Sequence, residues 1–186
     1  RSLVDDSHPT LTELLRYTMT VAGKRIRPAL PLLAGQSFHS DHAPLITMAS
    51  AVELFHTATL IHDDIVDKAL VRRGQPTVSS LHVQDVALLL GDYLFAQAAE
   101  IVCQTGNVEV MQLFAQTLSA ISGGELQHNM TSPGNRQTQQ HYFQWISHKT
   151  ASLFSLATTS GAILSQAPPQ AVQALRDYGH NLGLSF

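Results

Sequence analysis

The chain has 186 residues, of which 44% are hydrophobic and only 13% are charged; an average soluble domain has about 25% charged residues. This composition excludes a disordered chain and predicts a sizeable packed core. The formal net charge of −3 gives no general electrostatic footprint for nucleic acid, so we expect no such partner. A single cysteine excludes an internal disulfide framework.

The most apolar stretch, residues 86–102, is interrupted by Asp92, Gln97 and Glu100, which predicts that no helix spans a membrane. The chain begins at Arg1, and its first ten residues lack the apolar centre of a secretory signal. We therefore expect a cytoplasmic protein with further residues upstream of Arg1.

Apolar residues recur at helical spacing along most of the chain, and prolines separate the periodic segments. Helices are expected over 10–20, 28–38, 43–62, 80–104, 107–130, 138–165 and 170–185, and no segment alternates as a strand does. Seven helices without a sheet predict an all-α bundle. The absence of internal repeats and long linkers predicts one domain over residues 1–186.

The segment HTATLIHDDIVD, residues 56–67, carries the strongest chemical signal. Asp63 and Asp67 are four residues apart, so on a helix their carboxylates share one face and lie about 6 Å apart along the axis. Two such charges repel each other unless a cation lies between them. A few hard oxygen ligands suit Mg²⁺, which shares its site with water and substrate phosphates. A diphosphate-binding magnesium site is one interpretation, and an acidic helix end facing solvent is the other.

Two basic clusters flank this segment: GKRIRP at 23–28 and RRG at 72–74, which together hold five of the eleven cationic residues. Pro28 is expected to open a helix, which would place Lys24 and Arg27 near a helix N-terminus, where the dipole and free amides favour an anion. Arginine adds a two-pronged hydrogen-bond donor for phosphate oxygens. Acidic and basic clusters together favour a phosphate site over scattered surface charges.

Five segments, in order, resemble signatures of the trans-isoprenyl diphosphate synthases. They are GKRIRP at 23–28, ELFHTATLIHDDIVD at 53–67, RRG at 72–74, GDYLFAQA at 91–98 and SHKTASLF at 147–154. One such match could arise by chance, but five in order are specific. The resemblance implies an isoprenoid-synthase-type helical bundle around a deep central cavity. It also implies a magnesium-dependent polyprenyl diphosphate synthase that condenses isopentenyl diphosphate with an allylic diphosphate by ionisation, condensation and elimination.

The resemblance assigns roles to the residues that match these motifs. Asp63 and Asp67 are expected to ligate Mg²⁺ on the allylic diphosphate, with Asp64 supporting them from an adjacent face. The remaining assignments are Lys24, Arg27, His56 and Arg73 for isopentenyl diphosphate, Arg72 for the allylic diphosphate, and Lys149 and Thr150 for the leaving group.

The growing product is expected to pass along the helix that carries Asp63. Its wall would then be formed by the residues four, five, eight and eleven positions earlier, which are Thr59, Ala58, Phe55 and Val52. Small side chains at the first two positions leave the upper cavity open, which predicts a medium-chain or long-chain product. A large ring at Ala58 is expected to shorten it.

The family carries a second aspartate-rich motif on a later helix, and residues 179–186 stop short of it. We therefore expect the C-terminal part of the domain to be missing and these 186 residues to be a poor catalyst. The alternative is a non-catalytic subunit that shapes the cavity of a partner synthase, although such a subunit need not retain the first motif. A helical phosphohydrolase built on His62 and Asp63 would leave Asp67 and Lys149 unexplained. The resemblance further implies a homodimer.

Overall fold

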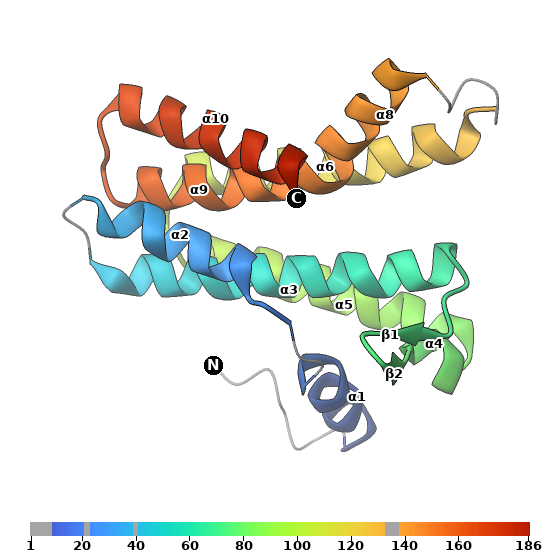
Figure 1. Ribbon diagram of the computed structural model, residues 1–186. Coiled ribbons are helices and arrows are strands. Elements are labelled where there is room, and N and C mark those ends of the chain that lie inside the picture. Colours follow the sequence, from blue (N-terminus) through green and yellow to red (C-terminus); the bar gives the residue numbers. More distant parts are fainter. Residues whose placement is uncertain (1–8, 21–22, 39–40, 133–137) are drawn as a thin grey trace. The chain divides into compact units, whose positions relative to one another are not determined.

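The structure is a computed structural model that describes residues 9–20, 23–38, 41–132 and 138–186 (Figure 1). Helices are α1 (Pro9–Thr20), α2 (Ile26–Gln36), α3 (His42–Val66), α4 (Val78–Leu81), α5 (Gln84–Cys103), α6 (Val108–Met130), α8 (Gln139–Ile146), α9 (Ser152–Leu164) and α10 (Pro169–Ser185), with a π-helical turn, η1 (Ser147–Ala151), between α8 and α9. A short antiparallel hairpin pairs β1 (Val71–Arg72) with β2 (Gln75–Pro76). The expected all-α class is confirmed.

The chain divides into two compact units. Unit 1 consists of residues 1–25 and 54–96, and it contains α1, the C-terminal part of α3, the hairpin, α4 and most of α5. Unit 2 consists of residues 26–53 and 97–186, and it contains α2, the first part of α3, the end of α5 and all later helices.

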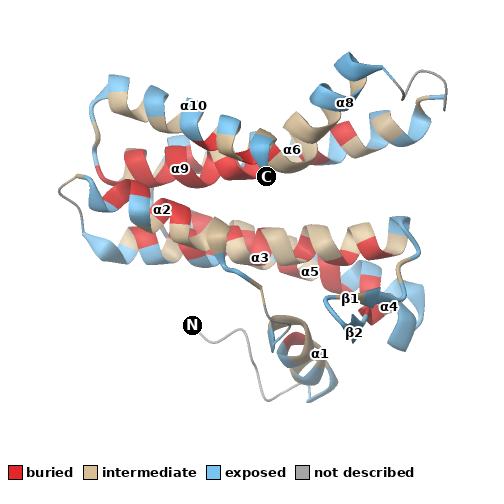
Figure 2. Ribbon diagram, in the orientation of Figure 1, coloured by how far each residue is buried: buried red, intermediate tan, exposed pale blue. Residues whose placement is uncertain are grey.

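The core of unit 2 is built around α9, which packs against both α2 and α10 and is buried along most of its length (Figure 2). Its middle is rich in small residues, so neighbouring helices can approach closely. The buried Thr158 hydroxyl donates across this contact to the Leu175 carbonyl oxygen on α10, at 2.6 Å. Because this hydroxyl has a partner, burying it carries little penalty.

Three elements differ from the sequence-based expectation. The helix expected over 138–165 begins at Gln139, directly after the N-cap Thr138, whose hydroxyl oxygen accepts from the His141 amide at 3.2 Å, but it is interrupted by the π-helical turn η1. The helix expected over 80–104 is preceded by the separate turn α4 and begins at Gln84. The expectation of no strand was wrong for the hairpin, whose two-residue strands are too short to show alternation.

Two helices, α3 and α5, are long and apolar enough to cross a membrane, with mean hydropathies of 1.3 and 1.6. In α3, half of the most apolar 18-residue segment is buried inside the protein. In α5, a third of the corresponding segment is buried. Length and composition alone are weak evidence for a membrane span, because the core helices of soluble proteins share these properties.

Candidate functional site

The aspartate pair lies where α3 ends, and the way in which the helix ends keeps both residues in helical geometry. Lys68 adopts a positive φ of 52°, and the Ala69 amide donates back to the Asp64 carbonyl at 2.9 Å, as in a Schellman helix stop. The Asp67 amide still donates to the Asp63 carbonyl at 2.8 Å. The backbone therefore places Asp63 and Asp67 one helical turn apart. Asp63 is half-buried and Asp67 is exposed.

Asp64 lies between these residues in sequence but turns toward the hairpin. The Arg72 Nε donates to Asp64 Oδ1 at 2.6 Å, and Asp64 is only 6% exposed. Burial raises the pKa of the Asp64 carboxyl above its ordinary value, and the hydrogen bond and positive charge of Arg72 oppose that rise. The pair fixes the guanidinium of Arg72 close to the aspartate motif.

The hairpin brings the two basic clusters of unit 1 together. Arg73 and Gly74 form its turn with φ values of 51° and 77°, and glycine accommodates such a value at no steric cost. The Arg73 guanidinium lies directly against the Gly23 backbone, where a Cβ would collide with it. Thr77 closes the loop, since its amide donates to the Leu70 carbonyl at 3.0 Å. The RRG segment therefore lies beside the GKR segment, in which Lys24 is exposed.

His62 fastens the aspartate end of α3 to α5, a contact that sequence reasoning missed. Its ring lies over Gly91, where no Cβ would fit. Its Nε2 is 3.1 Å from the Leu88 carbonyl oxygen and 3.4 Å from Asp92 Oδ1. This contact explains Gly91 and Asp92, the first two residues of GDYLFAQA. The available signal was the GDYLFAQA segment itself, at residues 91–98, which follows the aspartate segment.

The predicted substrate-binding residues are divided between the two units. Unit 1 holds Lys24, His56, Asp63, Asp64, Asp67, Arg72 and Arg73, and unit 2 holds Arg27, Lys149 and Thr150. The Arg27 guanidinium carbon lies 4.6 Å from the centre of the Phe154 ring and 5.5 Å from that of Phe186. Lys149 lies in the π-helical turn, where its Nζ is 3.1 Å from Glu125 Oε1. The contact of Glu125 with Lys149, like that of His62 with α5, was not predicted from the sequence.

The expected chain-length residues lie on α3 and are mostly buried. Val52, Phe55 and Ala58 have no exposed surface, while Thr59 is half-buried. The Phe55 ring packs edge-to-face on Phe95 of α5, with ring centres 5.3 Å apart. Phe55 therefore faces α5 inside unit 1. The Thr59 hydroxyl donates to the His56 carbonyl within its own helix, at 2.7 Å.

The two carboxylates at the end of α3 fit a magnesium ion whose remaining ligands are phosphate oxygens and water. Among the described residues, no three His, Cys, Asp or Glu side chains gather into a group that could hold a metal alone. Two carboxylates one turn apart are what Mg²⁺ uses when phosphate oxygens and water complete its shell. Asp63 and Asp67 would be its protein ligands, because Asp64 is bonded to Arg72.

Comparison with known proteins identifies the family. The Polyprenyl synthetase family matches residues 8–186, which is nearly the whole chain. The chain belongs to this family. The short chain isoprenyl diphosphate synthase of Methanothermobacter thermautotrophicus is 36% identical over 100% of the chain and 58% of its own length. The octaprenyl diphosphate synthase of Escherichia coli is 32% identical over 95% of the chain and 54% of its own length.

The fold of this polyprenyl synthetase chain is that of solved isoprenoid synthases. The crystal structure of a decaprenyl diphosphate synthase from Rhodobacter capsulatus superposes with a TM-score of 0.91 at 37% identity, covering 98% of the chain and 56% of that protein. The chain thus spans a little over half the length of the relatives it matches. The expected family and fold are confirmed.

Proposed function

We propose that the full protein is a trans-prenyltransferase that condenses isopentenyl diphosphate with an allylic diphosphate to make a medium-chain or long-chain polyprenyl diphosphate. The observation that carries this proposal is the placement of Asp63 and Asp67 one turn apart beside the Asp64–Arg72 pair, in a chain that matches the Polyprenyl synthetase family. The octaprenyl and decaprenyl names of its relatives support the product class.

In this reaction the allylic C–O bond ionises, the double bond of isopentenyl diphosphate attacks the resulting carbocation, and loss of a proton restores an alkene. Mg²⁺ held by Asp63 and Asp67 would neutralise charge on the diphosphate leaving group. The cationic side chains of Arg72 and Lys149 would each attract its oxygens as charge develops, and the neutral Thr150 hydroxyl would donate a hydrogen bond to them. Asp64 contributes by orienting the Arg72 guanidinium.

We assign Lys24, Arg73 and His56, which belong to unit 1, to the binding of isopentenyl diphosphate, and we assign the same role to Arg27, which belongs to unit 2. In unit 1, the contact of Arg73 with Gly23 supports this assignment, since it brings that guanidinium next to the segment that carries Lys24. In unit 2, the rings of Phe154 and Phe186 support Arg27 through cation–π contacts.

Incubating the full-length protein with Mg²⁺, farnesyl diphosphate and labelled isopentenyl diphosphate, then resolving products by chain length, tests the proposal. A ladder that ends at a medium or long polyprenyl species is expected. Release of inorganic phosphate without a longer prenyl chain would instead indicate a phosphohydrolase. Labelled product only after a second synthase subunit is added would indicate a cavity-shaping subunit, which the retained first aspartate motif does not favour.

We also propose that the protein works in the cytoplasm as a homodimer. The low charge content leaves room for an apolar subunit interface. Exposed apolar side chains on α5, such as Leu88 at 46% and Leu89 at 64%, support this proposal.

Replacing Thr59 with phenylalanine is expected to shorten the product by one or more isoprene units. Thr59 is half-buried and four residues before Asp63, so a ring there would occupy the path of the growing chain. Chromatography of the labelled products measures the shift, and Thr59→Val is the control of nearly unchanged shape.

Ala58→Phe should shorten the product as well, but it is the poorer test, because Ala58 has no exposed surface. Overpacking a filled site typically costs about 1–3 kcal/mol of stability. An unchanged product ladder in Thr59→Phe would show that this part of α3 does not line the cavity.

A further inference from the structure

Two side chains of unit 2, Trp145 and Lys149, converge on one carboxylate oxygen of Glu125, and all three residues are half-buried. Glu125 Oε1, on α6, accepts a hydrogen bond from Trp145 Nε1 of α8 at 2.8 Å. The same oxygen is 3.1 Å from the Lys149 ammonium of η1. Lys149 Nζ also lies 5.4 Å from the centre of the Trp145 ring. Glu125 therefore contacts both Trp145 and Lys149 through the same oxygen atom.

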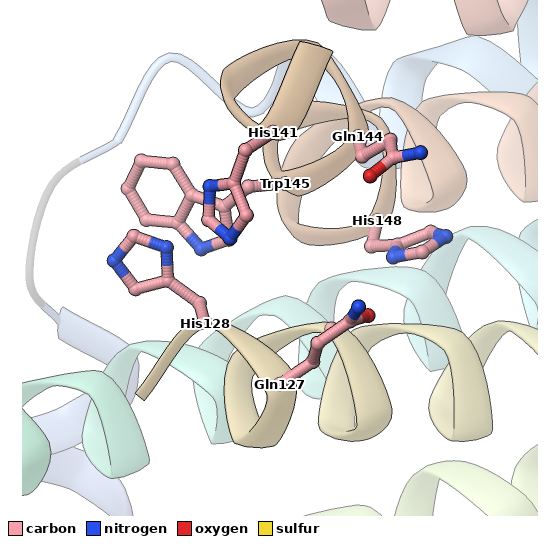
Figure 3. A pocket seen from close by; sticks show the side chains of 7 residues that line it. Gln127, His128, His141, Gln144, Trp145 and His148 are labelled. Carbon is pink, nitrogen blue, oxygen red and sulfur yellow. The ribbon is translucent and has the colours of Figure 1, made fainter. Parts of the chain in front are cut away.

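The Trp145 ring is itself held in place by its neighbours. The His128 ring stacks on it with centres 4.3 Å apart and planes 17° apart, and His141 lies 5.3 Å from His128 (Figure 3). These residues line a small pocket between α6 and α8. Because its ring is stacked and its N–H is bonded to Glu125, the indole offers Lys149 a fixed surface.

Lys149 occupies the π-helical turn that interrupts the helix running from α8 into α9. Such turns are rare and often lie at functional sites. A lysine side chain has four rotatable bonds, so placing its ammonium for a substrate normally costs conformational entropy. Contacts with Glu125 and Trp145 restrict that freedom before any substrate binds.

A partly exposed ion pair of this kind contributes little to stability, because solvent screens it. The exposed fractions of the two side chains are 25% for Lys149 and 22% for Glu125. The geometry is better explained by positioning than by stabilisation of the fold, since two donors of different elements share one acceptor atom.

We propose that Glu125 is a positioning residue that holds the Lys149 ammonium over Trp145, ready for the diphosphate of the allylic substrate. This inference rests on the proposed function, in which Lys149 contacts the leaving group. Glu125 itself does not touch the substrate. Its effect on the reaction passes through Lys149, and this dependence can be measured.

A double-mutant cycle in the full-length protein tests the proposal. The value of kcat/KM for farnesyl diphosphate is measured in the wild type, Glu125→Ala, Lys149→Ala and the double variant. Glu125→Ala is expected to lower kcat/KM about 10-fold alone but by less than about 2-fold when Lys149 is already alanine, since coupled residues are not additive. Glu109→Ala, an exposed acid on the same helix, is the matched control and should leave kcat/KM unchanged.

Glu125→Gln distinguishes loss of the charge from a folding defect. The amide oxygen of glutamine can still accept from Trp145, while the charge that attracts Lys149 is lost. We expect this variant to keep the wild-type circular dichroism and to lose part of the activity.

Trp145 gives a second readout, since it is the only tryptophan of the chain. Adding inorganic pyrophosphate with Mg²⁺ should change its fluorescence as Lys149 shifts toward the anion. The Trp145→Phe variant should lack this fluorescence change, which would show that the signal comes from Trp145. Lys149→Ala should abolish the change, and Glu125→Gln should alter it.

Additive losses in the cycle would overturn the positioning role while leaving the proposed function in place. Full activity of Lys149→Ala would show that Lys149 does not act on the substrate, and this result would overturn the inference. Absence of prenyl product from the wild-type protein, by contrast, would contradict the proposed function itself.

Discussion

Replacing Asp63 with asparagine should lower the rate of chain elongation by about 100-fold or more in the full-length protein. The amide keeps the size of the carboxyl group but loses the charge and one of the two anionic oxygens that suit Mg²⁺. Changing residues that only support metal ligands typically costs about 10–100-fold, so losing a ligand itself should cost at least as much. Steady-state incorporation of labelled isopentenyl diphosphate measures the effect, and added Mg²⁺ should restore part of it.

The same substitution should not weaken the fold. Like charges four residues apart on a helix destabilise it by only roughly 0.2–0.5 kcal/mol, so losing one charge should change the melting temperature in EDTA only slightly. Asp85→Asn changes an exposed carboxylate in the first turn of α5 and serves as the control, with activity expected at the wild-type level. Unchanged elongation in Asp63→Asn would show that the aspartate pair does not act on the diphosphate.

Replacing Gly183 with alanine should lower the free energy of unfolding by about 1–3 kcal/mol, as overpacking of a filled site does. Gly183 is buried on α10, and a Cβ there would collide with the Ala151 Cα and lie 3.1 Å from the Phe154 Cβ. Ala151 ends the π-helical turn, so the atom in the way belongs to backbone and cannot rotate aside. Urea denaturation followed by circular dichroism measures the change through its midpoint.

Gly123→Ala is the matched control for this prediction. Gly123 lies on α6, is exposed, and has no atom within 4 Å of where its Cβ would be. Alanine in a helix interior is favoured over glycine by up to about 1 kcal/mol, so this variant should be more stable than the wild type. The prediction fails if both variants shift the midpoint in the same direction.

Much of the fold and part of the site could be predicted from local sequence. Helical periodicity found most of the helices, and the four-residue spacing of Asp63 and Asp67 predicted that they share a turn. Both results depend on backbone geometry that a few neighbouring residues determine. The ordered motifs predicted the family, because each motif is a short run of residues.

The partners of the site residues could not be predicted in this way. Nothing in the spacing indicates that Arg72 pairs with Asp64 or that His62 lies over Gly91. The hairpin was missed because its strands have two residues each, and the π-helical turn at Lys149 was missed because helical periodicity does not register one inserted residue.

The sequence by itself therefore determined most of the helices and where the charged residues lie along them. Only the tertiary structure decided what those charges contact: Arg72 is bonded to Asp64, and Lys149 to Glu125. The physical reason is that a helix sets the direction of its side chains locally, through 3.6 residues per turn. A contact between residues 24 positions apart instead depends on how the helices pack, and that depends on the close fit of many side chains at once.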